Sequence, residues 1–395
     1  MRPFTSTISL DEARRRLAAN VRPIERTERV SLIDAAGRVA AADVVSPIDV
    51  PPFARSAMDG YAVLAADTPG RLRIVDRIYT GQPSTQSIVS GTCAEIATGA
   101  PLPSGADAVV MVEETTTVSD TEVAITAGAT AGQHIGRQGA DIKRGDRAVA
   151  AGDVLTPSRV GALAAIGCGD VLVYAKPRVA ILSTGNEVVE PGQPLPAGHI
   201  YDVNRFTLSA IAAAHGAVPE PHRPVADTID ALIVALGVCA AADLIVFSGG
   251  SSVGERDLIV DAIAARGEMI FHGIAVRPGK PTAFALVGTT PFFGMPGNPT
   301  SCLSNAYVLL VPFLRALARL PPWTPRTVRL PLARRIASAV GRHQFYTVRV
   351  IEGRAQPAFK GSGDITSLSQ ADGYIEIPAD QNVVDEGALV TVTFF

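Results

Sequence analysis

The chain has few of the residues that build disulfide frameworks, zinc sites or basic surfaces. Its 395 residues include four cysteines and six histidines, and both types are scattered. The cysteines match no disulfide-scaffold or CxxC spacing, which excludes a cystine-stapled domain and favours reduced thiols. The isolated histidines do not show the ligand spacing of a structural zinc site. With a formal net charge of −3, no overall basic field favours nucleic acid as a partner.

The sequence also lacks the long hydrophobic runs of a signal peptide or a membrane anchor. The first twenty residues carry acidic and then basic side chains at helical spacing, without the apolar core of a signal peptide. The most apolar stretch, Ala231 to Ala242, is too short to span a bilayer and is followed by Asp243. Together with reduced cysteines, these features predict a cytoplasmic protein.

The apolar content is sufficient for several hydrophobic cores. Hydrophobic residues make up 47% and charged residues 18% of the sequence, which argues against a disordered chain. The length corresponds to roughly two to four domains. Changes in residue pattern predict four domains. The first is a helical and linker domain of residues 1–45 and 146–177 that serves dimerisation, and a β-rich domain of residues 46–145 is inserted into it. An α/β domain of residues 178–322 and a C-terminal β-barrel of residues 323–395 follow.

The N-terminal segment and the insert differ in their periodicity. Ser9 and Glu12 form an S-x-x-E capping box, after which apolar residues recur at helical spacing. The same spacing returns between Gly152 and Gly167. Between these segments, short β-like runs alternate with Pro, Gly and Thr, which predicts strands and turns. This pattern indicates that a β-rich segment is inserted into a helical domain.

After residue 177, strands and helices alternate. The runs RVAILS (178–183) and DLIVFSGG (243–250) are apolar throughout, which is typical of strands buried on both faces of a parallel sheet. Helical patterns cover residues 204–215 and 228–241, and Asn298-Pro299 opens a final long helix. We therefore expect a multi-domain α/β plus β fold. Its central domain would be a three-layer α/β/α arrangement with a mainly parallel sheet.

Three glycine-rich loops follow the predicted strands of this domain. In an open α/β sheet, ligands bind at the carboxyl ends of the strands, and glycines allow backbone N–H groups to approach an anion. Any one glycine pair could be only a tight turn, but three such loops at strand ends favour a binding site. The loops are STGNE, SGGSSVGERD and GMPGNP, with candidate ligand-binding residues Ser183, Thr184, Gly185, Ser248, Gly249, Gly250, Pro296 and Asn298.

Charged residues lie beside the glycine-rich loops. Glu187 and Asp257 each close one of them, and Asp227 lies beside a turn. A lone Asp beside a turn is as often a cap or an Asx turn, an alternative that stays open for Asp227. Carboxylates near an anionic ligand need a bridging cation, and Mg²⁺ binds one or two carboxylates together with phosphate oxygens. Arg277 and Lys280, in VRPGKP, supply positive charge from a predicted tight turn, unless they are only solvated surface cations.

The insert contains three unusual loop sequences: PPFARSAMDGYAV (51–63), ATGAPLPSGADAVVMVEE (97–114) and GRQGADIKRGD (136–146). Their composition indicates ordered functional loops, without a specific chemistry. Taken together with STGNE, SGGSSVGERD, RPGKP and PGNP, and in this order, the motifs resemble those of the molybdopterin molybdenumtransferase family, to which the gephyrin E domain is also similar. The resemblance extends from about residue 51 to residue 299, and the flanking segments have the lengths of that family's four-domain layout.

The resemblance implies a reaction and an assembly. Members insert molybdate into adenylylated molybdopterin with Mg²⁺-dependent release of AMP, and a separate adenylyltransferase supplies the substrate. They form homodimers in which the partner's insert completes the site. By resemblance, Asp59, Glu187, Asp227 and Asp257 are catalytic, and Asp227 and Asp257 hold the metal. Arg277 and Lys280 would bind the pterin phosphate, adenylate or molybdate, Thr98 and Asp141 would contribute from the insert, and Ser367 from the C-terminal domain.

Two positions depart from the family pattern. Thr347, in GRHQFYT, occupies a position where members often have Arg, and Arg349 lies two residues further on. Gly273 replaces a basic residue found in some members. Two alternatives therefore stay open: a nucleotide hydrolase of a related α/β family, and a non-catalytic pterin-binding scaffold. The first would release AMP without molybdate, and the second would bind molybdopterin without releasing AMP.

Overall fold

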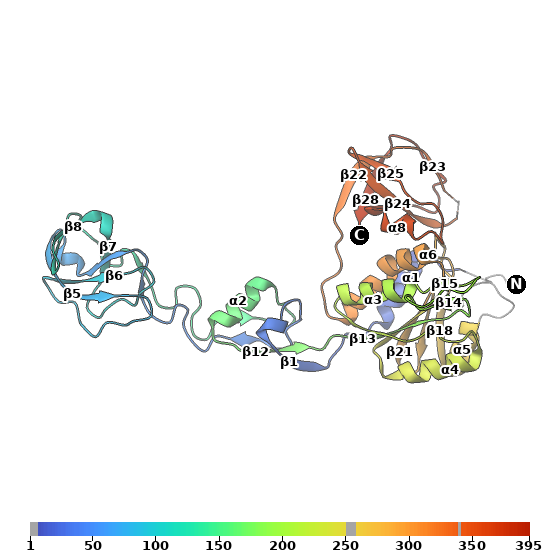
Figure 1. Ribbon diagram of the computed structural model, residues 1–395, viewed down its shortest axis with the longest axis horizontal. Helices are drawn as coiled ribbons and strands as arrows, with labels where there is room; N and C mark the ends of the chain where they lie inside the picture. The colour runs from blue at the N-terminus through green and yellow to red at the C-terminus, as the bar shows by residue number, and fades with distance from the viewer. Residues whose placement is uncertain (1–6, 250–257, 339–340) are drawn as a thin grey trace. The chain divides into compact units, whose positions relative to one another are not determined.

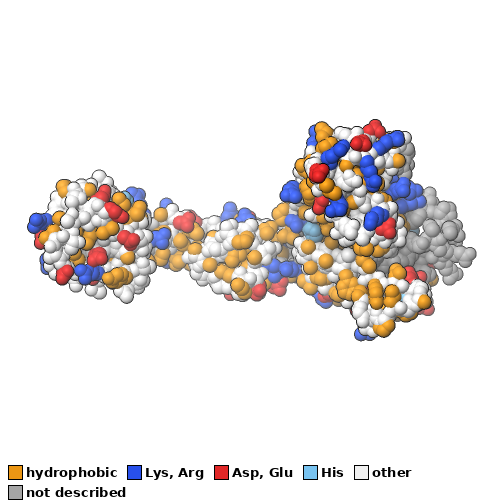
Figure 2. All heavy atoms as spheres, turned by 45° about the horizontal axis from the view of Figure 1, so that its top comes forward, with side chains coloured by type: hydrophobic (Ala, Val, Ile, Leu, Met, Phe, Trp, Pro, Cys, Tyr) orange, Lys and Arg blue, Asp and Glu red, His pale blue; other side chains and the backbone are white. Residues whose placement is uncertain are grey.

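The computed structural model describes residues 7–249, 258–338 and 341–395 (Figure 1). The chain divides into two compact units. The main unit comprises Met1–Glu28 and Tyr174–Phe395, and the inserted unit comprises Arg29–Val173. Gly250 and Asp257, both predicted site residues, lie outside the described residues. Figure 2 shows Lys and Arg side chains interspersed with Asp and Glu, in keeping with the small net charge.

One half of the inserted unit is a six-stranded sheet. Its only parallel pair is β5 with β6, and the other neighbours are antiparallel. Side chains alternate between its faces, so that Tyr61 and Val63 enter one hydrophobic cluster and Ala62 the other. The strand order is β7 (Ala108–Met111), β4 (Gly60–Val63), β6 (Thr92–Ile96), β5 (Gly70–Ile78), β9 (Glu122–Ile125) and β8 (Thr115–Ser119).

The other half of the inserted unit packs around α2 (Pro157–Ala165). Thr156 caps this helix by accepting a hydrogen bond from the N–H of Arg159, and Pro157 occupies its first turn. Leu155 and Leu163 are fully buried in the cluster beneath it. Short antiparallel pairs complete the unit: β2 (Val44–Val45) with β11 (Arg147–Val149), and β3 (Arg55–Ser56) with β10 (Ile135–Gly136). β1 (Thr27–Ser31) pairs with β12 (Asp170–Tyr174) where the chain passes between the units.

The main unit contains a mixed six-stranded sheet. The order is β16 (Val218–Pro221), β13 (Arg178–Ser183), β17 (Leu244–Ser248), β21 (Thr290–Met295), β20 (Ala283–Val287) and β18 (Gly267–His272). The first four strands are parallel, but β20 is antiparallel to both of its neighbours. Only two residues, Gly288 and Thr289, connect β20 with β21, and so short a connection requires antiparallel strands. The prediction of a mainly parallel sheet therefore holds for the four-stranded part alone.

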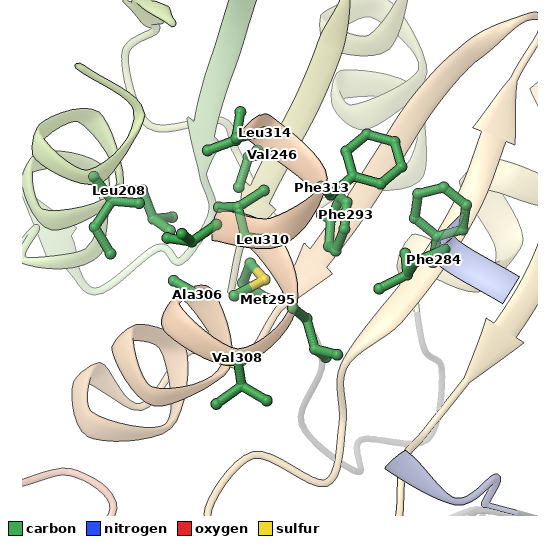
Figure 3. Packing of buried hydrophobic residues seen from close by; sticks show 14 of the residues in the cluster. Leu208, Val246, Phe284, Phe293, Met295, Ala306, Val308, Leu310, Phe313 and Leu314 are labelled. Carbon is green, nitrogen blue, oxygen red and sulfur yellow. The ribbon is translucent and has the colours of Figure 1, made fainter. Parts of the chain in front are cut away.

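Hydrophobic clusters cover both faces of this sheet. In β13, Val179 and Ile181 enter one cluster, whereas Ala180 and Leu182 enter the other. The centre of the first cluster consists of Phe284, Phe293 and residues of the helical segment Pro299–Leu317 (Figure 3). The helices α1 (Leu10–Asn20), α3 (Asn204–Ala214), α6 (Pro299–Asn305) and α7 (Val311–Leu317) contribute to the first cluster, and α4 (Ile229–Val238) and α5 (Leu258–Arg266) to the second.

The predicted first helix begins as expected, with half of its capping box. Ser9 Oγ accepts a hydrogen bond from the N–H of Glu12 at 3.1 Å. The Glu12 carboxylate instead accepts from Arg16 Nε at 2.7 Å, and this bond lowers the pKa of Glu12. Arg16 also donates to the carbonyl oxygen of Ile270 at 2.8 Å. An ion pair one helical turn further along α1 therefore takes the place of the reciprocal cap.

The predicted helix after Asn298 is present but irregular. α6 passes into a π-helical segment, Ala306–Leu310, before α7 completes it. By length and composition alone, Pro299–Leu317 could span a membrane, but 72% of its 18-residue apolar window is buried inside the protein. It is longer than the apolar stretch Ala231 to Ala242 that the sequence had singled out. Its apolar character reflects its position in the core of the main unit.

The C-terminal residues form strands around their own hydrophobic cluster, which includes Leu332, Val348 and Ile375. The main strand order is β19 (Val276–Arg277), β24 (His343–Ile351), β26 (Gly373–Ile377), β28 (Leu389–Phe394) and β22 (Thr327–Pro331), with β25 (Arg354–Pro357) on β24. β23 (Ile336–Ala337) pairs with β27 (Val383–Val384), and β14 (Val188–Val189) pairs with β15 (Ile200–Tyr201) near β13. A short helix, α8 (Thr366–Ser369), interrupts the predicted all-β pattern.

Candidate functional site

A cleft of about 1310 Å³ lies at the carboxyl ends of β13, β17 and β21. The described residues of the three glycine-rich loops therefore lie at one edge of the sheet, as expected for an α/β fold. The roles of their residues in binding stay predictions. The predicted residues that line the cleft are Ser183, Thr184, Gly185, Glu187, Asp227, Ser248, Gly249, Arg277, Lys280, Pro296 and Asn298.

Gly249 allows two of these loops to approach each other. Its φ of +113° is a conformation that side chains rarely adopt. A Cβ at this position would lie 2.4 Å from the carbonyl oxygen of Thr184, which is fixed backbone. Ser248, the preceding residue, accepts a hydrogen bond from the N–H of Thr184 through its carbonyl oxygen. The backbone of the SGG loop is thus packed directly against the STGNE loop.

Asn204, at the start of α3, joins the SGG loop to the PGNP loop. Its Nδ2 donates to Ser248 Oγ and to the carbonyl oxygen of Gly297, each at 2.7 Å. The side chain is buried, and its Oδ1 has no hydrogen-bond partner among the residues that the structure describes. Asn204 was not among the sequence-predicted residues, although it lies in the cleft wall. Its amide positions the end of β17 against the PGNP loop.

Unpartnered oxygen atoms gather in the cleft. Thr184 Oγ1, Asn204 Oδ1 and Asp227 Oδ1 are buried and lack hydrogen-bond partners within the described part of the chain. Each belongs to a residue that lines the cleft. Buried polar atoms normally have partners, so these three oxygens suit a ligand that supplies a cation or donors. Oxygen donors of this kind fit Mg²⁺, and the Asp227 carboxylate is the natural ligand among them.

A buried ion pair supports the floor of the cleft. Asp202 Oδ2 accepts from Ser183 Oγ at 2.6 Å and lies 3.2 Å from Arg205 Nε. Arg205 also contacts Glu190, with 2.9 Å between Nη2 and Oε1. Asp202 and Arg205 are both almost completely buried. Burying two charges requires such pairing, so this network fixes Ser183 and the start of α3.

The predicted cationic turn is held by Asn305, a fully buried residue of α6. Asn305 Nδ2 donates to the carbonyl oxygen of Gly279 at 2.8 Å and to Thr282 Oγ1 at 2.6 Å. Gly279 has a φ of +100°, and a Cβ there would lie 2.2 Å from Asn305 Nδ2. Because Gly279 separates Arg277 from Lys280, this contact sets the turn that brings both cations to the cleft.

We expect Asn305→Ala to destabilise the main unit by about 2 kcal/mol, because it removes two buried hydrogen bonds. Urea unfolding followed by the fluorescence of Trp323, the single tryptophan and a residue of the main unit, measures this change. Asn20→Ala is the matched control, since it removes one hydrogen bond from the half-buried end of α1. Equal stabilities of the two variants would contradict a special role for Asn305.

Ser367 does not line the cleft, in contrast to the prediction. It is fully buried, and its Oγ accepts from the N–H of Lys360 at 3.0 Å. The loop that it supports, residues 360–363, does line the cleft. On the other side of this loop, Asn298 Nδ2 donates to Ser362 Oγ at 3.0 Å. Ser367 is therefore a positioning residue in this structure.

The positions that depart from the family pattern lie outside the residues that line the cleft. Thr347 is 1% exposed, and its Oγ1 has no hydrogen-bond partner in the described structure. Arg349 is exposed and pairs with Gln356 of β25. The backbone of Gly273 bonds to Ile8 and Thr282. Arg349 is thus not among the residues that line the cleft in the described chain.

The structure adds two cations that the sequence reasoning missed. Arg342 and Lys360 are exposed and line the cleft together with Arg277 and Lys280. The sequence offered one indication, because Lys360 begins a KGSG segment whose glycines resemble those of the other loops. Arg342 had no comparable local pattern. Its place in the cleft depends on the pairing of β24 with β19.

The predicted residues of the inserted unit form a separate local arrangement. Asp59 Oδ1 accepts from the N–H of Thr98 at 2.7 Å. Hydrogen bonds from the backbone and side chain of Thr98 lower the pKa of Asp59, which keeps this carboxylate ionised. Asp59 lines a cavity of about 220 Å³ with Tyr61 and Arg77. Asp141 is exposed in another loop, where its N–H donates to the carbonyl oxygen of Val50.

The residues of the cleft are suited to binding and electrostatic stabilisation. Cys302, beneath the cleft, is fully buried, and burial raises the pKa of its thiol to about 12. A thiol in this state is a poor nucleophile. The cleft instead combines carboxylates, amide and hydroxyl oxygens, and four cations. Such a set suits a multiply charged anion bound together with a cation.

Three family models match the chain in sequence order. The MoeA N-terminal region (domain I and II) matches residues 8–167, and the MoeA C-terminal region (domain IV) matches residues 329–395. Between them, a model described as a probable molybdopterin binding domain matches residues 180–316. This middle segment carries most of the residues that line the cleft.

Relatives match over almost the whole chain. A molybdopterin molybdenumtransferase from Haemophilus influenzae is 34% identical, covering 98% of each chain. Molybdopterin molybdenumtransferase 2 from Mycobacterium tuberculosis is 34% identical over 97% of this chain and 98% of its own. A solved molybdopterin biosynthesis MoeA protein from Pyrococcus horikosii has a TM-score of 0.85 at 37% identity, covering 98% of this chain and 99% of its own.

Proposed function

Because this chain belongs to the molybdopterin molybdenumtransferase family, and is thus a transferase of molybdenum cofactor biosynthesis, we propose that it inserts molybdate into adenylylated molybdopterin with Mg²⁺-dependent release of AMP. The family predicted from the sequence motifs is confirmed. The reaction itself is supported by one observation above all. Unpartnered buried oxygens and four cations line the same cleft, which suits a substrate that carries phosphates, a metal and an oxyanion.

Each part of the cleft has a proposed task. Arg277 and Lys280 bind the negative charge of phosphate or molybdate, and Glu187 orients the pterin. Asp227 would hold Mg²⁺ together with Asp257, which lies outside the described residues. When bound, Mg²⁺ supplies charge neutralisation at the phosphate oxygens. The residues of the chain perform no covalent step in this scheme, since positioning and electrostatic stabilisation suffice for phosphoryl chemistry.

We extend the proposal to the assembly. Residues 1–45 and 146–177 would form the dimerisation domain of a homodimer, and residues 323–395 a small β-barrel. Asp59 of the partner subunit, Thr98 of the partner subunit and Asp141 of the partner subunit would complete each site. The ionised state of Asp59 supports a role near a metal or a cationic group. A separate cytoplasmic adenylyltransferase would supply the substrate.

The test is AMP release from adenylylated molybdopterin by the purified protein with Mg²⁺, in the presence and absence of molybdate. Release that depends on molybdate, with active cofactor formed, supports the proposal. AMP release at the same rate without molybdate would contradict it and indicate a nucleotide hydrolase. No release at all would indicate a pterin-binding scaffold.

We expect Asp227→Asn to lower AMP release at limiting Mg²⁺ by about 100-fold, because the neutral amide is a much weaker metal ligand. A Mg²⁺ titration of the rate should show the loss diminishing as the metal concentration rises. Asp230→Asn is the matched control, since Asp230 is an exposed residue in the first turn of α4, three residues away. An Asp227→Asn variant with an unchanged Mg²⁺ dependence would remove Asp227 from the metal site.

A further inference from the structure

Two strands carry the chain between the main unit and the inserted unit. β1 leaves the main unit after Glu28, and β12 returns to it at Tyr174 (Figure 1). The two strands pair with each other. We propose that Asp243 and Arg319 clamp the roots of both strands to the main unit, and that they are positioning residues for the reaction. This inference rests on the proposed function, in which the inserted unit of a partner subunit completes each site.

Asp243 holds the root of the outgoing strand. Arg26 directly precedes β1, and its Nη1 and Nη2 donate to Asp243 Oδ1 and Oδ2 at 2.6 Å and 2.7 Å. A guanidinium and a carboxylate joined by two parallel bonds are fixed in direction as well as in distance. Asp243 Oδ2 also accepts from the N–H of Arg178 at 2.8 Å. Because Arg178 begins β13 and Asp243 precedes β17, the root of β1 is tied to the central sheet.

Arg319, just beyond the end of α7, holds the root of the returning strand. Its guanidinium carbon lies 4.2 Å from the ring centroid of Tyr174, the last residue of β12. Its Nε also donates to the carbonyl oxygen of Ile24 at 2.5 Å, two residues before Arg26. A cation over a ring face and a hydrogen bond from a charged donor are both favourable. One side chain therefore contacts the chain on both sides of the connection.

The backbone conformation at Arg319 supports a task for its side chain. Its φ of +57° lies in the left-handed region, which glycine adopts more readily than other residues. The position directly follows Ala318, the C-cap of α7, where glycine is the usual residue. The chain thus carries an arginine where the backbone favours glycine. Such a conformation persists when the side chain has a role that offsets its cost.

The two roots are also bonded to each other. The N–H of Ala175 donates to the carbonyl oxygen of Arg26 at 2.8 Å. Hinge motions are absorbed by a few residues at the ends of elements, which is where these contacts lie. A change of angle at the roots moves every residue of the inserted unit, including Asp59 and Thr98. Because a displacement near 1 Å at a reacting centre costs about 100-fold in rate, holding the roots matters for catalysis.

The test uses Arg319→Gly and Asp243→Asn in the full-length protein. Glycine suits the positive φ, so Arg319→Gly removes both contacts of the side chain while the turn still folds. Small-angle X-ray scattering should require a wider range of positions for the inserted unit in both variants. The kcat of molybdate-dependent AMP release should fall about tenfold. The KM for adenylylated molybdopterin should stay unchanged, because neither residue lines the cleft.

Three further substitutions separate the clamp from general stability. Tyr174→Phe keeps the ring beside Arg319 and should behave as the wild type, whereas Tyr174→Leu removes the ring and should resemble Arg319→Gly. Glu220→Gln is the matched control, since it breaks the ion pair of Glu220 with Arg178, 2.6 Å between Oε1 and Nε, beside the clamp. This variant should leave both the scattering and kcat unchanged.

Wider scattering together with a lower kcat in Arg319→Gly and Asp243→Asn supports the clamp. Unchanged scattering in both variants would overturn it, as would an equal effect of Glu220→Gln. Wider scattering with wild-type AMP release would overturn the positioning role in the reaction. A wild type that releases no AMP, but whose clamp variants still show wider scattering, would refute the proposed reaction and leave the clamp standing.

Discussion

Gly249→Ala is expected to lower molybdate-dependent AMP release by about 100-fold, the effect of a displacement near 1 Å at a reacting centre. The added Cβ would lie 2.4 Å from the carbonyl oxygen of Thr184, and the φ of +113° disfavours any side chain. Either the SGG loop or the STGNE loop must move. Because both loops line the cleft, the move displaces Thr184 and Ser248 from their positions in its wall. Steady-state AMP release at saturating Mg²⁺ measures the loss.

Gly237→Ala provides the matched control for this substitution. Gly237 lies in α4, and a Cβ there would meet no atom within 4 Å. Alanine favours a helix interior over glycine by up to about 1 kcal/mol, so this variant should be as active and slightly more stable. A Gly249→Ala protein with wild-type AMP release would show that the close approach of the two loops is not needed for the reaction.

Phe293→Ala should destabilise the main unit by about 4 kcal/mol, the usual cost of removing a large aromatic side chain from a core. Phe293 is fully buried in β21. Its ring centroid lies 5.0 Å from that of Phe284 and 5.2 Å from that of Phe313 (Figure 3). The cavity would open between the sheet and α7, so neither partner can easily fill it. Urea unfolding followed by Trp323 fluorescence reports on this unit.

Phe206→Ala should cost less than about 1 kcal/mol in the same experiment. Phe206 is 50% exposed, and the guanidinium carbon of Arg205 lies 4.9 Å from the centroid of its ring. The ratio of the two losses in unfolding free energy shows whether burial or aromatic character determines the cost of each substitution. Similar losses for Phe206→Ala and Phe293→Ala would mean that the aromatic cluster does not dominate the stability of the main unit.

Local patterns were sufficient to predict the elements that lead into the site. The apolar run RVAILS coincides with β13, because a strand buried on both faces needs apolar residues at successive positions. The glycine-rich loops could be placed together because the carboxyl ends of neighbouring parallel strands share one edge. The prediction of the capping box was correct for Ser9 but not for Glu12. The Glu12 carboxylate bonds to Arg16, and Arg16 itself donates to the distant carbonyl oxygen of Ile270.

The residues that the sequence did not reveal depend on contacts between distant segments. Asn204 joins loops 44 and 93 residues away, and its own neighbourhood contains no glycine-rich pattern. Arg342 reaches the cleft through the pairing of β24 with β19. Ser367 shows the opposite case, because a motif placed it at the site but its side chain faces the interior of a loop. The spacing of residues along the chain does not show which of these distant segments are in contact.

The insertion of one unit within the other determines when the first helix can be buried during synthesis. Arg16 of α1 bonds to the carbonyl oxygen of Ile270, 254 residues later, and the N–H of Ile24 bonds to the carbonyl oxygen of Leu317. The ribosome makes the whole inserted unit before any of these partners emerges. α1 leaves the exit tunnel before the inserted unit and is therefore covered only after that unit has been made, and nascent chains that stop short expose its apolar face to chaperones and proteases.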